Sequence, residues 1–228
     1  MTQVAIDGPA SSGKSSVGTR VAAVLGYGFL DTGLLYRAVT RAALDAGAQF
    51  VALTSTDPLS AAQIDQVVQL AHRTDVDLES GGASIIVDDR NFTASELESD
   101  TVERSVAAVA ALPDVRAALR TVQREIAMRG GVVLAGRDIG TVVYPEARHK
   151  FFLDATAEAR ALRRALQRGY AVDSVKHQEA LRSLVARDQE DRTRAVAPLR
   201  AADDAQVIMT DALGLTDVVD LIVRQVRR

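Results

Sequence analysis

The sequence of 228 residues contains no cysteine and only three lysines. Without cysteine there are no disulfides, thiolate zinc ligands or cysteine nucleophiles, which fits a reducing compartment. No apolar run approaches the roughly 18 residues of a membrane-spanning helix. The formal net charge of −3 gives no general attraction to nucleic acid or to an anionic membrane. We therefore expect a cytoplasmic enzyme that binds neither nucleic acid nor membrane. From the sequence as a whole we expect a monomer whose partners are small-molecule substrates.

The first residues also lack a leader pattern. Val4 opens an apolar run directly after three residues, and we expect no signal peptide before the fold. Arginine replaces the missing lysine, because 24 of the 27 basic residues are arginines. A bias toward arginine codons accounts for the overall ratio. Nine of the arginines nevertheless lie between Arg160 and Arg200, and guanidinium forks suit phosphate, so an anion site is plausible there.

One glycine-rich stretch stands out near the start of the chain. Gly8-Pro-Ala-Ser-Ser-Gly-Lys-Ser15 fits the pattern G-x-x-x-x-G-K-[ST] at every fixed position. A short apolar run precedes it and a helical pattern follows, as a phosphate-binding loop requires. Its glycines let backbone N–H groups approach a polyphosphate, and the helix that starts near Lys14 directs its positive dipole end at the same phosphates. Lys14 would neutralise β- and γ-phosphates, while the Ser15 hydroxyl would be a ligand of Mg²⁺.

Apolar runs alternate with helical patterns along most of the chain. Five runs predict strands at 4–6, 29–31, 132–135, 150–153 and 205–209. Helical spacing predicts helices at 13–26, 34–44, 113–129, 156–168, 174–192 and 216–227. This alternation predicts an α/β fold with a five-stranded, doubly wound parallel sheet that binds ligands at the carboxyl ends of its strands.

Residues 48–112 interrupt this alternation. A helix is expected after Pro58, a hairpin at 76–88 with its turn at 80–82, and a short third strand at 91–93. We interpret this part as an insertion that contains a small antiparallel sheet, within a single domain over residues 1–228.

The phosphate loop alone does not define the reaction. The strand at 132–135 ends in Gly136-Arg137-Asp138, not in the Asp-Glu metal site of a motor, and no N-K-x-D base reader of a GTPase occurs. Arginines follow strands or lie in helices instead, at positions 37, 116, 137, 187 and 194. That pattern suits a second anion brought against the γ-phosphate.

Four stretches together resemble the bacterial cytidylate kinases. They are Ile6–Ser15, Leu30-Asp-Thr-Gly-Leu-Leu-Tyr-Arg37, Gly136-Arg-Asp-Ile-Gly-Thr-Val-Val-Tyr-Pro145 and Arg187-Asp-Gln-Glu-Asp-Arg-Thr-Arg-Ala-Val-Ala-Pro198. The resemblance runs essentially end to end, and the last two stretches are the most specific. It implies transfer of the γ-phosphoryl group of ATP to CMP or dCMP with Mg²⁺. It also implies a kinase core (1–47, 113–155 and 172–228), a nucleoside-monophosphate-binding insert (48–112) and a lid (156–171).

The resemblance further implies a role for individual residues. The ATP-binding loop would be Gly8, Pro9, Ala10, Ser11, Ser12, Gly13, Lys14, Ser15 and Ser16. The CMP-binding residues would be Thr32, Arg37, Arg116, Arg137, Asp138, Arg187, Asp191 and Arg194. Within that set Arg37, Arg137 and Arg194 would contact the acceptor phosphate, Arg116 and Asp138 the cytosine, and Arg187 and Asp191 the pentose. The catalytic residues would be Lys14, Arg137, Arg194 and the lid arginines Arg163 and Arg164.

The chemistry of a nucleoside monophosphate agrees with an arginine-rich site. Its second pKa lies near 6, so the acceptor is mostly dianionic and requires no general base. Repulsion between two polyanions is the obstacle, which arginines and Mg²⁺ reduce. Asp138 would accept a hydrogen bond from the cytosine amino group, whereas the carbonyl of uracil would face it acceptor to acceptor, so UMP should be a poorer substrate.

Several alternatives stay open from the sequence. Ala107 stands where the family has a base-contacting serine, so either Ser105 substitutes or one contact is absent. Arg163 and Arg164, with Arg160 and Arg168, fit a solvated helix face equally well. Arg187, Asp191 and Arg194 have the spacing of a salt-bridge ladder. The three histidines show no metal-ligand spacing.

Two rival functions also stay open. One is a phosphate-loop kinase for a hydroxyl acceptor with Asp31 as its base, and the other is a nucleotide-regulated binding protein with slow ATPase activity.

Overall fold

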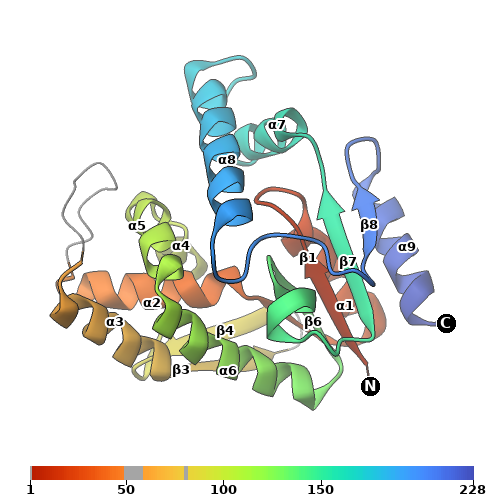
Figure 1. Ribbon diagram of the computed structural model, residues 1–228. Helices are drawn as coiled ribbons and strands as arrows, with labels where there is room; N and C mark the ends of the chain where they lie inside the picture. Colours follow the sequence, from red (N-terminus) through yellow and green to blue (C-terminus); the bar gives the residue numbers. More distant parts are fainter. Residues whose placement is uncertain (1, 49–58, 80–81) are drawn as a thin grey trace. The chain divides into compact units, whose positions relative to one another are not determined.

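A five-stranded sheet and a three-stranded sheet organise the protein (Figure 1). The computed structural model describes residues 2–48, 59–79 and 82–228. Within them the chain forms two compact units, one of Met1–Phe29 with Gly130–Arg228 and the other of Leu30–Arg129. We call them unit 1 and unit 2. Among the described residues, no helix is both long and apolar enough to cross a bilayer.

The larger sheet has the order β2-β6-β1-β7-β8. Its strands are β1 (Gln3–Asp7), β2 (Gly28–Asp31), β6 (Val132–Gly136), β7 (His149–Asp154) and β8 (Gln206–Met209). The central strand β1 runs parallel to β6 and to β7, and β7 runs parallel to β8. The predicted five-stranded parallel sheet is confirmed, and its strands match the five apolar runs.

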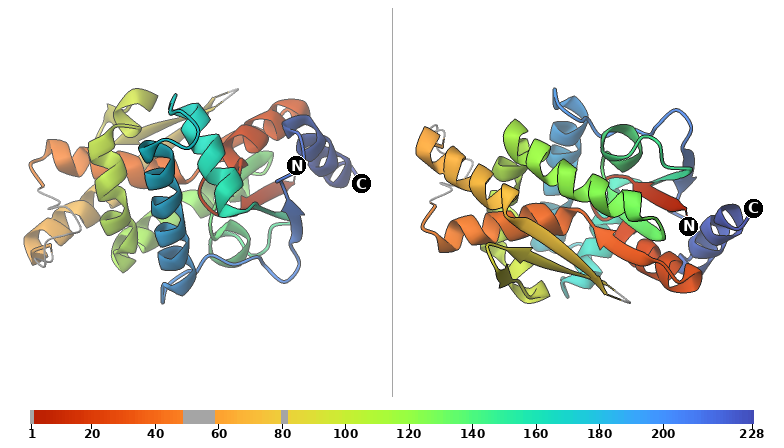
Figure 2. Two further views of the ribbon diagram at one scale, coloured as in Figure 1. Left: turned by 90° about the horizontal axis from the view of Figure 1, so that it is seen from above. Right: turned by 90° about the horizontal axis from the view of Figure 1, so that it is seen from below.

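Helices α1 (Lys14–Leu25) and α9 (Leu215–Val226) form the layer that covers one face of this sheet in unit 1. They lie side by side in both views of Figure 2. Alternate residues such as Val4 and Ile6 on β1 and Val133 on β6 face this layer, where they meet Val21 and Ile222. Because a parallel strand is covered on both faces, it reads as a continuous apolar run.

Unit 1 also contains the segment after β6 and the two helices after β7. A single turn of wide helix, η1 (Ile139–Val143), follows β6. Helices α7 (Ala157–Gln167) and α8 (Val175–Thr193) confirm the two helical patterns predicted on either side of Gly169. The two helices pack against each other.

Unit 2 contains a helical group and the antiparallel sheet β3-β4-β5. Its elements are α2 (Gly33–Asp45), α3 (Ala61–His72), β3 (Thr74–Glu79), β4 (Gly82–Val87), β5 (Arg90–Asn91), α4 (Ala94–Leu97), α5 (Asp100–Ala111) and α6 (Pro113–Arg129). The hairpin and the short third strand are therefore present, while Pro58, Ser80 and Gly81 lie outside the described residues. Helices α4 and α5, for which we had made no prediction, have Thr93 and Ser99 as their N-cap residues, residue types that favour this position.

Unit 2 is longer than the predicted insert 48–112. Helix α2 packs against α3, α4, α5 and β4, and α6 packs against α3, α5 and β3. Both flanking helices therefore share a core with the insert. The functional division into core, insert and lid stays a prediction.

Candidate functional site

The register of the large sheet brings two chain segments to the same edge. Asp7, the last residue of β1, pairs with Gly136, the last residue of β6. The two strands are parallel, so Gly8 and Arg137 leave the sheet next to each other. This end of the sheet therefore carries both the phosphate loop and the predicted acceptor residues Arg137 and Asp138, as expected for the carboxyl edge of a parallel sheet.

The backbone of the phosphate loop has the conformation that its glycines predict. Gly8 has a φ of 149°, and a Cβ there would overlap the carbonyl oxygen of Leu153. Gly13 has a φ of 99° and is the N-cap of α1. Ser11 adopts the left-handed region with a φ of 59°, which is uncommon for a residue with a side chain. The loop is thus a strained turn that opens a twelve-residue helix, a geometry suited to anion binding.

Side chains of the loop are placed consistently with a nucleotide site. Lys14 Nζ donates to the carbonyl oxygen of Pro9 at 2.7 Å, so its ammonium lies over the loop. Ser15 is exposed at the second residue of α1, where its hydroxyl fits a cation shared with the phosphates. The Ser12 hydroxyl is buried, and its Oγ has no hydrogen-bond partner among the described residues.

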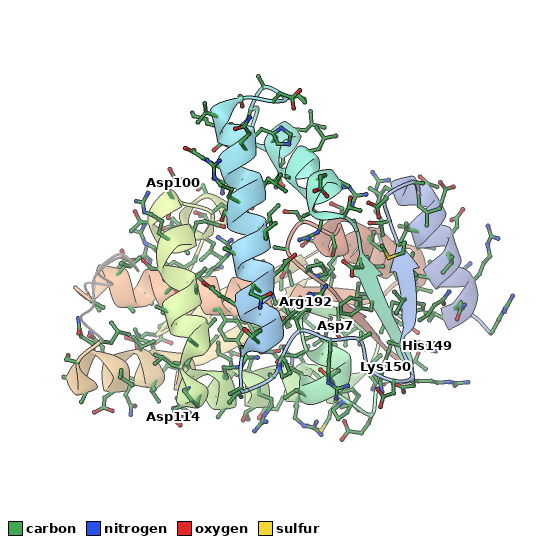
Figure 3. All side chains as sticks on the ribbon, turned by 45° about the horizontal axis from the view of Figure 1, so that its top comes forward. Asp7, Asp100, Asp114, His149, Lys150 and Arg192 are labelled. Atoms are coloured by element: carbon green, nitrogen blue, oxygen red, sulfur yellow. The ribbon has the colours of Figure 1, made fainter. Side chains whose placement is uncertain are left out.

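Asp7 is a buried carboxylate beneath this edge (Figure 3). Its Oδ1 accepts from the backbone N–H of Ile139 at 2.8 Å, and its Oδ2 accepts from that of Gly140 at 2.7 Å. Desolvation by burial raises the pKa of Asp7 from 3.8 to about 7, opposed by these two hydrogen bonds. The charge of Asp138 also raises the pKa, and that of Lys14 lowers it.

The two hydrogen bonds link the strand before the phosphate loop to the segment just after Arg137 and Asp138. Gly140 permits this approach, because a Cβ there would lie 3.3 Å from Asp7 Oδ2 and 3.1 Å from Lys150 Cδ. The wide turn η1 begins here, with the backbone N–H groups of Val142 and Val143 both donating to the carbonyl of Asp138. Asp138 itself is buried, with 7% of its surface exposed.

One carboxylate holds two of the predicted phosphate-binding arginines. Asp191, near the end of α8, lies with its Oδ2 2.5 Å from Arg137 Nε and its Oδ1 3.2 Å from Arg194 Nη1. The first contact has the distance of an ion pair but lacks hydrogen-bond geometry. Arg194 also donates from Nε and Nη2 to the carbonyl of Ala197. The salt-bridge ladder expected from the spacing on α8 is present between Asp191 and Arg194. Asp191 also contacts Arg137, which directly follows β6.

The lid arginines differ from one another in their surroundings. Arg163 donates from Nη1 to Thr210 Oγ1 at 2.9 Å and from Nη2 to the Thr210 carbonyl at 2.5 Å. Arg164 is half-buried on the same helix. Arg160 is 3% exposed, so the alternative of a solvated helix face is wrong for this residue. The assignment of Arg163 and Arg164 to the transferring phosphoryl group stays a prediction.

Unit 2 holds the three other predicted acceptor residues. Thr32 is buried as the N-cap of α2, beside Asp31, whose Oδ1 accepts from the Gly33 N–H at 3.0 Å. Arg37 donates from Nη1 to the Leu97 carbonyl at 3.0 Å and from Nη2 to Glu103 Oε2 at 2.5 Å.

Arg116, the third of these residues, lies over the ring of Tyr36 at 5.6 Å and donates to the carbonyl of Ala110. Ala107 is partly exposed on α5, whereas Ser105 is buried. The two residues therefore differ in accessibility. Recognition of the base by either residue stays a prediction.

The site residues thus fall into two groups by unit. Unit 1 contains the phosphate loop, Arg137, Asp138, Asp191 and Arg194, with Arg187 one helical turn before Asp191 on α8. Among the described residues, no three His, Asp or Glu side chains gather to bind a metal ion. The donor set that fits Mg²⁺ here is the Ser15 hydroxyl together with oxygens of a bound polyphosphate.

Sequence reasoning missed three residues that shape this edge of the sheet. Asp7, Asp188 and Thr210 make their contacts with residues far away in the chain. No local pattern marks such partners. The only signal for Asp7 is a carboxylate placed directly before a phosphate loop, at the end of a strand that reads as fully buried.

The parallel sheet, the loop at the end of its central strand and the adjoining arginines define a phosphate-loop phosphotransferase. Comparison with known proteins specifies the family. The sequence model of the cytidylate kinase family matches residues 4–228. The chain belongs to the cytidylate kinase family and is an enzyme of the nucleoside-monophosphate kinase class.

Individual relatives cover almost the whole chain. A cytidylate kinase of Limosilactobacillus fermentum is 41% identical over 229 residues, covering 99% of this chain and 96% of the relative. One from Streptococcus suis is 43% identical, covering 96% of this chain and 94% of the relative. A shikimate kinase structure from Bacteroides thetaiotaomicron, 11% identical, superposes with a TM-score of 0.51 and covers 100% of this chain and 99% of that chain. At that identity the likeness concerns the fold alone.

Proposed function

We propose that this enzyme transfers the γ-phosphoryl group of ATP to CMP or dCMP, with Mg²⁺, in pyrimidine nucleotide metabolism. The observation that carries the proposal is the pairing of Asp7 with Gly136. Through it the glycine-rich loop and Arg137 leave the ends of adjacent strands, and Asp191 on α8 pairs with both Arg137 and Arg194. Such an arrangement suits a reaction in which two phosphate groups must approach each other.

The donor half of the proposal concerns the loop and α1. The backbone N–H groups of Gly8–Ser16 would hold the phosphates of ATP, and Lys14 would exchange the Pro9 carbonyl for phosphate oxygens. Ser15 would bind Mg²⁺ with the β- and γ-phosphates. The cation would neutralise negative charge that otherwise repels the acceptor.

The acceptor half concerns both groups of residues. Arg137 and Arg194 would bind the dianionic phosphate of CMP, and their shared contact with Asp191 keeps two like charges together before the phosphate arrives. Arg187 and Asp191 would contact the pentose, and Asp138 the cytosine amino group. From unit 2, Thr32, Arg37 and Arg116 would add contacts to the same nucleotide.

The lid and the general properties complete the proposal. Arg163 and Arg164 would stabilise charge on the transferring phosphoryl group, which requires Arg163 to exchange its present contacts with Thr210. The proposed enzyme is a cytoplasmic monomer whose substrates are ATP and CMP or dCMP.

A coupled assay of ADP release tests the proposal directly. The purified protein is incubated with ATP and Mg²⁺ and with CMP, dCMP, UMP, AMP, GMP or no acceptor. We expect turnover with CMP and dCMP, weaker turnover with UMP, and background rates otherwise. ATP hydrolysis that CMP leaves unchanged would instead favour a nucleotide-regulated binding protein. Failure of all five nucleotides would favour a hydroxyl acceptor.

A further inference from the structure

Arg160 is an arginine of unit 1 to which the proposed reaction assigns no role. It lies in the first turn of α7 and is 3% exposed. A buried guanidinium is costly unless its N–H groups are paired. Arg160 meets this requirement through hydrogen bonds to three separate segments of unit 1, one of which is the phosphate loop.

The first two segments anchor the side chain. Its Nε donates to the carbonyl of Ala155, just before α7, at 3.0 Å. Its two terminal nitrogens form a fork with Asp188 on α8, with Nη1 3.1 Å from Oδ1 and Nη2 2.5 Å from Oδ2. A paired fork of this kind fixes both the position and the plane of the guanidinium.

The third segment is the loop itself. Arg160 Nη1 also donates to the carbonyl oxygen of Ala10 at 3.2 Å. In a trans peptide the carbonyl and the following N–H point in opposite directions. Holding the Ala10 oxygen toward Arg160 therefore turns the N–H of Ser11 away from it. Backbone N–H groups are the donors with which such a loop cradles phosphates.

Ser11, whose N–H belongs to this peptide, has a strained backbone conformation. Ser11 has a φ of 59°, and a non-glycine residue in the left-handed region persists only where its surroundings impose that conformation. On the amino-terminal side of this peptide, Lys14 holds the carbonyl of Pro9. A phosphate ligand would compete for that ammonium, whereas Arg160 is buried and makes four hydrogen bonds to protein groups.

We propose that Arg160 is a positioning residue that, anchored by Asp188 of α8, holds the Ala10–Ser11 peptide of the phosphate loop in its phosphate-binding orientation. The inference rests on the proposed use of this loop for ATP. It also links the loop to α8, the helix that presents Arg187 and Asp191. The hydrogen bonds of Arg160 to Ala155, Ala10 and Asp188 all go to protein groups.

The test compares Arg160→Lys with Arg168→Lys, the same substitution at an exposed position at the end of the same helix. Lysine keeps the charge but cannot form a planar fork, so it cannot hold Asp188 and Ala10 in the same way. Calorimetric titration with ADP and Mg²⁺, without acceptor, measures binding at the loop. We expect about tenfold weaker ADP binding and a higher KM for ATP in Arg160→Lys, and wild-type values in Arg168→Lys.

Asp188→Asn provides a second variant in case Arg160→Lys does not fold. It removes the anchor but leaves the Ala10 contact, so we expect about threefold weaker ADP binding. The double variant should bind ADP no more than twofold worse than Arg160→Lys, because both substitutions act through one contact. Wild-type protein that fails to bind ADP would refute the proposed function. The role of Arg160 would be overturned if the wild type binds ADP and both single variants, measured below their melting temperatures, bind ADP with the same affinity.

Discussion

Replacing the buried carboxylate of Asp7 by an amide should change how stability depends on pH. Burial raises the pKa of Asp7 from 3.8 to about 7. An acid whose pKa is raised on folding binds more protons in the folded than in the unfolded state across this window. The free energy of unfolding therefore falls as pH rises from about 4 to about 7. At 1.36 kcal/mol per pKa unit, the loss amounts to about 4 kcal/mol.

Asp7→Asn removes this proton linkage at nearly constant shape. The amide oxygen can still accept one of the N–H groups of Ile139 and Gly140, while its NH₂ group faces the other donor. That mismatch costs about 1–3 kcal/mol, independently of pH. The informative quantity is therefore the slope of the stability difference against pH, not its value at one pH.

Urea unfolding of both proteins between pH 4 and pH 8.5 measures this slope. Titrations of other groups largely cancel in the difference. We expect the wild type to lose stability relative to Asp7→Asn at up to about 1.4 kcal/mol per pH unit, until the curve flattens above pH 7. The charges of Asp138 and Lys14 both act on the pKa of Asp7, so both residues are kept unchanged in the two proteins that are compared.

Asp204→Asn is the control for a carboxyl whose pKa is shifted in the opposite direction. Hydrogen bonds from Lys150 lower the pKa of Asp204, so its contribution is fully present above the unfolded pKa and is lost as pH falls through the folded pKa. The stability difference for Asp204→Asn should therefore stay nearly flat across most of the measured range. A constant stability difference for Asp7→Asn from pH 4 to pH 8.5 would refute the reasoning. It would mean that the two N–H groups compensate fully for burial.

Three further predictions concern the loop and the base. Lys14→Ala should lower kcat at least about a hundredfold, since one preorganised charge contact is worth this much; a rate within fivefold of wild type in the ADP assay would contradict its role. Gly8→Ala should lower the free energy of unfolding by about 3 kcal/mol, because the new Cβ meets the Leu153 carbonyl. Gly26→Ala is the control, with a φ of 69° but open space around the new Cβ, and should lower it by about 1 kcal/mol. Equal losses in urea unfolding would argue against the overlap. Asp138→Ala should reduce the kcat/KM ratio of CMP to UMP at least tenfold, and an unchanged ratio would remove Asp138 from base recognition.

The sequence alone determined the strands of both sheets, most of the helices and the place of the phosphate loop, but not α4, α5 or η1. Strands that are buried on both faces read as apolar runs, and helices repeat their apolar residues at a fixed spacing, so both patterns are local. The loop is equally local, because its glycines are required by backbone geometry at Gly8 and Gly13. The arginines at 137 and 194 were singled out by the resemblance to the cytidylate kinases, whose specific stretches contain both of them.

Only the tertiary structure decided which side chains meet. Asp7 and Gly140, or Arg160 and Ala10, are separated by 133 and 150 residues, and their contacts depend on the strand order β2-β6-β1-β7-β8. The same holds for Asp191, whose spacing indicated a pair on its own helix but whose second oxygen reaches Arg137. Burial and charge pairing depend on the whole surroundings of a side chain, and therefore a local pattern cannot tell the buried Arg160 from its more exposed neighbours on the same helix.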